Sequence, residues 1–313
     1  MLTGALMAGS VVGCSSAPDR GDGLHIEAAF YPLAYVAEEV GGNLVTVHEL
    51  TPAGAEPHDL DLKPRDVGRM SDADLVVYLA GLQPAVDDAV RDADATAFEV
   101  SDAAVLDLML PEGTEHEHGD DHADESESAG DDAHDEDGTG APDPHFWLDP
   151  TKLASVATAV GERLADIDPP NAATYRANAA SLVTELTDLD TDLATGLADC
   201  AETDLVTSHL AFGYLARRYG FHQVGISGLS PNREPSAAKL AEVADFIRDN
   251  GVSTVYFETL ASPALAEALA GESGAATAVL DPIEGISDDS PGTDYPSVMR
   301  ANLSALRSGQ RCP

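Results

Sequence analysis

Two patterns of hydrophobic and polar positions alternate along the chain from Leu24 onward. Short apolar runs, typical of buried strands, are separated by longer stretches with an apolar residue at every third or fourth position, typical of helices. The strands are predicted at 24–29, 43–50, 74–80 and 97–100, and again at 204–208, 223–226, 252–258 and 277–281. Strands that alternate with helices predict an α/β fold with two βα lobes, each built on a mainly parallel sheet.

One predicted helix is much longer than the rest and covers about 171–199. At a rise of 1.5 Å per residue it measures about 40 Å, which exceeds the width of one small lobe. We therefore expect it to join the lobes, with a ligand cleft between them. The expected regions are an N-terminal lobe at 24–150, linking helices at 151–201 and a C-terminal lobe at 202–313. The apolar stripe of the long helix consists of Tyr175, Ala179, Leu182, Leu186, Leu189, Leu193 and Leu197.

Acidic residues dominate the charge of the chain. The 16 Lys and Arg against 56 Asp and Glu give a net charge of −40, which would repel a phosphate backbone and excludes nucleic acid as a partner. The segment 112–140 concentrates this acidity without a Lys or Arg, so we predict a disordered insertion. Its imidazoles are possible secondary metal ligands that capture an ion loosely, or else they belong to a simple solvated linker: His116, His118, His122 and His134.

Residues 2–13 form an uncharged apolar stretch that ends at Cys14. Twelve residues are too few to span a bilayer, but they suit a signal peptide. The sequence V-V-G-C resembles the cleavage motif of bacterial lipoproteins, which implies a signal peptide with its lipobox at 1–14 and lipidation of Cys14. We therefore expect an extracytoplasmic protein anchored to the outer face of the membrane. A buried free cysteine is the alternative.

Cys200 and Cys312 are the two remaining cysteines. In an exported protein a single pair of this kind is expected to be oxidised, so we predict a disulfide bond between them. Two separate thiols are the alternative.

Three histidines and one aspartate stand near the ends of predicted strands or at the exit of the insertion: His58, His145, His209 and Asp281. In open parallel sheets, ligands bind outside the carboxyl ends of the strands, so we expect these side chains to converge. Three imidazoles and a carboxylate suit Zn²⁺ better than Mn²⁺, which prefers more oxygen. From spacing alone, a histidine at the end of a strand is more often a structural residue than a metal ligand.

Four local sequences resemble the metal-binding segments of the cluster 9 solute-binding proteins, the zinc and manganese receptors of bacterial ABC importers. They are G-A-E-P-H-D-L-D-L-K-P (54–64), D-P-H-F-W-L-D-P (143–150), V-T-S-H-L-A-F-G-Y-L-A-R-R-Y-G (206–220) and V-L-D-P (279–282). The resemblance implies that His58, His145, His209 and Asp281 are the metal ligands, that a rigid helix joins the lobes, and that a third imidazole favours the zinc branch. Because Pro57 stands where some zinc members carry an acid, Glu56, Asp281 or water remains open for the fourth position.

The expected function is therefore that of a monomeric receptor that binds Zn²⁺ as its transported ligand and delivers it to an ABC permease. It is not expected to be an enzyme. The alternatives are a manganese or iron receptor of the same fold and a zinc-dependent hydrolase with Glu56 or Glu258 as general base. A role in cell adhesion could coexist with transport.

Overall fold

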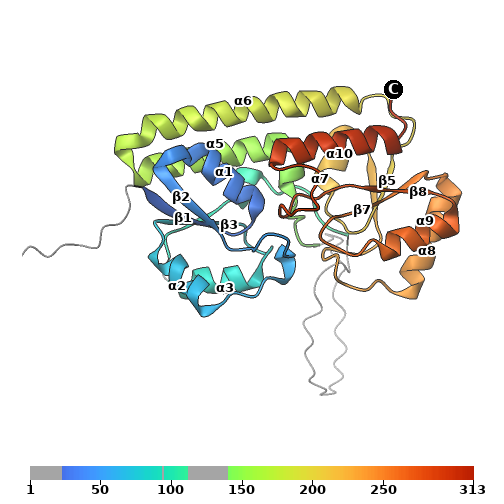
Figure 1. Ribbon diagram of the computed structural model, residues 1–313, viewed down its shortest axis with the longest axis horizontal. Helices are drawn as coiled ribbons and strands as arrows, with labels where there is room; N and C mark the ends of the chain where they lie inside the picture. The colour runs from blue at the N-terminus through green and yellow to red at the C-terminus, as the bar shows by residue number, and fades with distance from the viewer. Residues whose placement is uncertain (1–22, 94, 112–139) are drawn as a thin grey trace, which may run out of the picture.

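The computed structural model describes residues 23–93, 95–111 and 140–313. Figure 1 shows two α/β lobes side by side, with a layer of long helices across both. Within the described ranges, no helix combines the length and the apolar character that a membrane crossing requires. The predicted signal peptide with Cys14, and the insertion histidines His116, His118, His122 and His134, lie outside the described residues.

The N-terminal lobe is built on four parallel strands in the order β2-β1-β3-β4. The strands are β1 (Leu24–Ala28), β2 (Val45–Glu49), β3 (Leu75–Tyr78) and β4 (Ala97–Glu99). The helices are α1 (Tyr31–Gly41), α2 (Pro64–Asp72), α3 (Pro84–Asp92) and the short α4 (Ser101–Ala104). The four strands lie where the sequence predicts them, whereas a single turn such as α4 is too short to produce a helical period.

The C-terminal lobe repeats the same arrangement, with parallel strands in the order β6-β5-β7-β8. Its strands are β5 (Asp204–Thr207), β6 (His222–Gly225), β7 (Thr254–Phe257) and β8 (Ala276–Val279). Its helices are α7 (Gly213–Tyr219), α8 (Ala237–Asn250) and α9 (Ala264–Ser273). The prediction of two parallel-sheet lobes is confirmed.

A layer of three helices connects the lobes: α5 (Pro150–Ile167), α6 (Ala172–Gly196) and α10 (Tyr295–Gly309). The predicted stripe of α6 is buried, and Leu186, Leu189 and Leu193 are fully inaccessible. Each buried leucine contributes roughly 1.5–3 kcal/mol relative to an exposed one. α6 contacts α1 of the N-terminal lobe as well as α5 and α10, so its apolar face holds parts of both lobes together.

Helix ends follow the local sequence. Gly251 closes α8 with φ of 66°, a left-handed conformation that costs glycine little, and Ser236 caps the start of the same helix. The start of α9 has a proline as its N-cap. Pro263 is the N-cap rather than the first helical residue, because the helix begins at Ala264, whose backbone N–H is donated to the hydroxyl of Ser262.

Cys200 and Cys312 form the predicted disulfide, across 112 positions of sequence. Cys200 follows the end of α6, and Cys312 follows α10, so the bond ties the C-terminal tail to the linking helices.

Candidate metal centre

The three predicted histidines come from three different places in the fold. His58 lies in a 3-10 turn (Pro57–Asp59) in the loop after β2, and His209 comes two residues after β5. His145 precedes a second 3-10 turn (Phe146–Leu148) that leads into α5. Two of the three thus follow the carboxyl ends of parallel strands, where ligands of such sheets gather.

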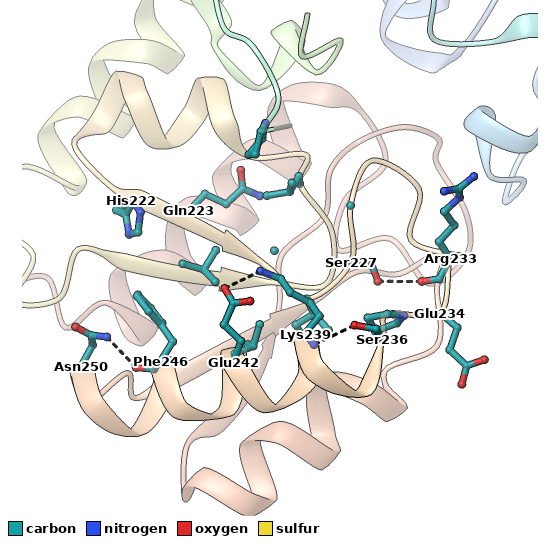
Figure 2. Close-up of a pocket in the computed structure, with 18 of the residues that line it drawn as sticks. His222, Gln223, Ser227, Arg233, Glu234, Ser236, Lys239, Glu242, Phe246 and Asn250 are labelled. Atoms are coloured by element: carbon teal, nitrogen blue, oxygen red, sulfur yellow. Dashed lines mark hydrogen bonds and ion pairs between the residues drawn. The ribbon is translucent and has the colours of Figure 1, made fainter. Parts of the chain in front are cut away.

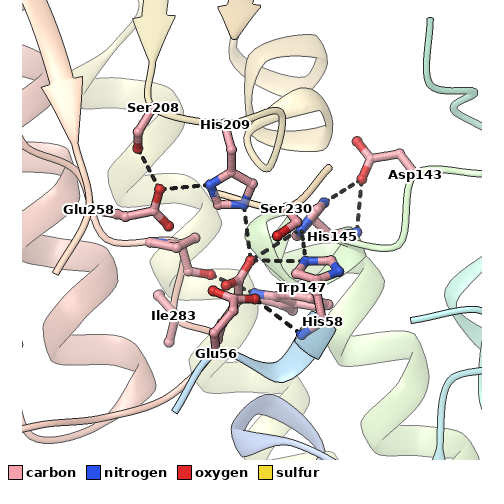
Figure 3. A network of polar contacts seen from close by, with 12 residues as sticks. Glu56, His58, Asp143, His145, Trp147, Ser208, His209, Ser230, Glu258 and Ile283 are labelled. Carbon is pink, nitrogen blue, oxygen red and sulfur yellow. Dashed lines mark hydrogen bonds and ion pairs between the residues drawn. The ribbon is translucent and has the colours of Figure 1, made fainter. Parts of the chain in front are cut away.

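The structure brings these side chains together at the junction of the lobes (Figure 3). The Nε2 atoms of His58 and His145 are 3.2 Å apart. A carboxylate oxygen of Glu284 lies 3.2 Å from Nε2 of His145, 3.2 Å from Nε2 of His209 and 3.6 Å from Nε2 of His58. All four ligand atoms lie within 4.8 Å of one another, and the four residues are buried. We call this group the four-residue cluster.

These separations fit a small tetrahedral ion. Bonds of about 2.0–2.1 Å at tetrahedral angles place ligand atoms about 3.3 Å apart, close to the distances between the Glu284 oxygen and the imidazole nitrogens. Three neutral nitrogens with one carboxylate oxygen are also a donor set that zinc accepts readily.

The fourth member of the cluster is Glu284, and this corrects the expectation for Asp281. The carboxylate of Asp281 is used by its own loop: it accepts the backbone N–H of Ile283 at 2.8 Å and the hydroxyl of Thr259 at 3.0 Å. This turn carries the chain past Asp281 and brings Glu284 to the imidazoles. The acid in D-P-I-E-G was visible in the sequence, but the turn that selects it was not.

Glu56 and Glu258 lie beside the cluster and outside it. Glu56 accepts the backbone N–H of His58 at 3.1 Å, and Glu258 lies 2.9 Å from Nδ1 of His209, as expected for a partner of an imidazole rather than a ligand. His25, His48 and His222 are away from the cluster, where His48 pairs with Glu27 and His222 with Asp204.

Buried charges shape the protonation of the cluster. Burial disfavours the charged form of His209, but Glu258 and Glu284 outweigh it and raise the pKa of this imidazole well above its usual value. Burial likewise opposes protonation of His145, where Asp143 and Glu284 prevail and raise its pKa. For His58, burial lowers the pKa. Protons therefore compete with an ion for His145 and His209.

Trp147 fixes the loops that carry the ligands. Its indole ring packs 5.3 Å from the ring of His145, and its Nε1–H is donated to the carbonyl of Pro282 at 2.7 Å. Its own carbonyl accepts the hydroxyl of Tyr295 at 2.5 Å. The segment of His145 and the loop of Glu284, which belong to different lobes, are thereby held in register.

A separate groove of about 820 Å³ lies between β6 and α8 (Figure 2). His222, Arg233 and Phe246 are among its lining residues, and an ion pair between Lys239 and Glu242 crosses its helical side. None of the four residues of the cluster lines this groove.

Two parallel-sheet lobes, a long helix across both and a buried set of possible ligand atoms at their junction are the architecture of a solute-binding protein. The chain belongs to the family described as zinc-uptake complex component A, periplasmic, whose model matches residues 26–309.

Relatives and solved structures agree with this assignment. The chain is 36% identical over 310 residues to the zinc-binding lipoprotein AdcA of Streptococcus pneumoniae, covering 98% of this chain but only 60% of that protein's length. It superimposes with a TM-score of 0.76 on the laminin-binding protein of Streptococcus agalactiae, described as having adhesin and metal-transporting activity, at 29% identity over 92% of this chain and all of the other. For the Zn(II)-bound ZnuA-like domain of Streptococcus pneumoniae AdcA, the TM-score is 0.72 at 33% identity, over 92% and 99% of the two chains.

Proposed function

We propose that this protein is an extracytoplasmic receptor that binds Zn²⁺ through His58, His145, His209 and Glu284 and delivers it to an ABC permease. One observation carries the proposal: four donor atoms, from four segments that are distant in the sequence, lie within 4.8 Å of one another in residues that are all buried. A site of this kind encloses its ion with protein ligands and leaves no room for a substrate, which favours a receptor over a hydrolase.

The membrane anchor at Cys14 and a monomeric state belong to the same proposal. The V-V-G-C motif supports the anchor, as does the similarity to a relative named a lipoprotein. In this arrangement the lipid tethers the receptor near its permease, and the ion is cargo rather than a cofactor for a reaction.

Metal analysis of the purified protein tests the function. We expect one tightly held Zn²⁺ per chain, and competition with a chromogenic chelator should show that Zn²⁺ is preferred over Mn²⁺. His209→Ala should abolish the tight site, whereas His222→Ala, which removes an exposed imidazole far from the cluster, should retain it. A wild-type protein that prefers Mn²⁺ would instead establish a manganese receptor of the same fold.

A further inference from the structure

Two buried carboxylates contact the imidazole rings of His145 and His209 (Figure 3). Each contact is on the side of the ring that faces away from the cluster. Asp143 Oδ1 lies 2.7 Å from Nδ1 of His145, and Glu258 Oε1 lies 2.9 Å from Nδ1 of His209. Both carboxylates are about as inaccessible as the ligands, at 1% exposure each. Neither offers an oxygen to the group of four ligand atoms.

These contacts decide which nitrogen of each ring is available to an ion. A carboxylate oxygen accepts a hydrogen bond from Nδ1, so this nitrogen keeps its proton and Nε2 is the nitrogen that a proton or an ion can occupy. The third ring differs, because Nδ1 of His58 is buried without a hydrogen-bond partner. The site therefore has two imidazoles whose Nδ1 atom is held by a carboxylate and one, His58, whose Nδ1 atom has no such partner.

The protein fixes the two carboxylates as well. Asp143 Oδ1 accepts the backbone N–H of His145 at 2.9 Å, and the other oxygen of Asp143 rests against the start of α7. A Cβ at Gly213 would lie 2.5 Å from Asp143 Oδ2, so only glycine leaves room for this carboxylate. The hydroxyl of Ser208 is donated to Glu258 Oε1 at 2.5 Å.

We infer that Asp143 and Glu258 are positioning residues that orient His145 and His209, raise their strength as ligands and thereby set the affinity of the site for Zn²⁺. This inference rests on the proposed function. Outer hydrogen-bond partners of this kind typically change metal affinity by about 10- to 100-fold when they are removed.

The test compares Asp143→Asn and Glu258→Gln with a matched control, Asp204→Asn. Asp204 Oδ1 also lies at hydrogen-bond distance, 3.0 Å, from the Nδ1 atom of a histidine, but that histidine is His222, which is outside the cluster. Zinc affinity is measured by chelator competition, and the visible spectrum of the Co²⁺-loaded protein reports ligand geometry. We expect Asp143→Asn and Glu258→Gln each to weaken zinc binding by about 10- to 100-fold and to alter the Co²⁺ bands. The control should retain both the affinity and the spectrum.

Ser208→Ala and Gly213→Ala extend the test if a carboxylate variant does not fold. Both leave the two carboxylates in the chain and change only how they are held, so each should shift the Co²⁺ spectrum and weaken binding less than loss of the carboxylate. Wild-type affinity and an unchanged spectrum in folded Asp143→Asn and Glu258→Gln would overturn the inference. Failure of the proposed function looks different: the wild type itself would prefer another ion, and the same variants would then be compared with that ion.

Discussion

At the scale of single residues, the loop after β8 shows how a turn selects one of two nearby carboxylates. Ile283 has φ of 57°, in the left-handed region that β-branched residues rarely occupy, and it is fully buried. The carboxylate of Asp281 stabilises this conformation by accepting the N–H of Ile283. The side-chain amide of Asn302 accepts the backbone N–H of Asp281 and donates to its backbone carbonyl. Asp281 thus shapes the loop, and Glu284 faces the imidazoles.

Substitution separates these two roles. Glu284→Gln should weaken zinc binding by more than about 100-fold, since even the loss of an outer hydrogen-bond partner typically costs 10- to 100-fold. Asp281→Asn keeps an oxygen that can accept the N–H of Ile283, so zinc affinity should stay near the wild-type value. Isothermal titration with a competing chelator measures both. Equal losses for the two variants would contradict the assignment of Glu284 to the cluster.

The pH dependence of zinc binding follows from the same contacts. In the metal-free protein the pKa of His145 is raised, and that of His209 is raised well above its usual value, by carboxylates that outweigh burial. Protons therefore compete with the ion while the pH is still above the ordinary range of histidine. Apparent affinity should fall continuously from pH 8 to pH 5, by up to about tenfold per pH unit for each proton displaced. A flat profile over this range, measured with a chelator of known pH dependence, would exclude ligation by these imidazoles.

At the scale of helices and strands, the sequence alone predicts an element where its apolar pattern is long or where a glycine marks its end. The stripe from Tyr175 to Leu197 predicts α6, and a glycine such as Gly251 at the end of α8 is likewise a local signal, because both act within a few residues of the chain. The three histidines could be predicted as convergent for a similar reason, since strand order in a parallel sheet aligns strand ends. The identity of the fourth residue could not be predicted in this way. It depends on a loop conformation that is stabilised by Thr259 and Asn302, which are distant from the loop in the sequence.

The disulfide is an element-scale constraint that acts on stability rather than on the site. It closes a loop across 112 positions, for which the chain-entropy model gives about 4–5 kcal/mol. Replacing Cys200 and Cys312 together by serine should lower the free energy of unfolding by about 2–5 kcal/mol. Urea unfolding followed by circular dichroism measures this loss. Zinc affinity of the folded variant should be unchanged, and a large loss of affinity would show that the tail also shapes the cluster.

At the scale of the whole molecule, α6 determines how the lobes can move. Its 25 residues span about 37 Å in the helical layer of Figure 1. It contacts α1 of the N-terminal lobe, and its Asp190 forms an ion pair with Arg218 of α7 in the C-terminal lobe. A flexible hinge would need loop residues that absorb a large change in φ and ψ, whereas a continuous helix resists bending. The ligand atoms of the cluster already lie close enough together to coordinate one ion, so an ion can be held without a large rotation of the lobes.

Small-angle X-ray scattering tests this rigidity. The radius of gyration should be the same with and without Zn²⁺, because α6 fixes the lobes relative to each other. Thr187→Pro breaks α6 at an exposed position while keeping every buried leucine, and Thr187→Ala at the same position preserves the helix. We expect the proline variant alone to gain a zinc-dependent change in radius, because its lobes can now separate when the ion is removed. A clear contraction of the wild-type protein on zinc binding would show instead that the lobes close around the ion despite the continuous helix.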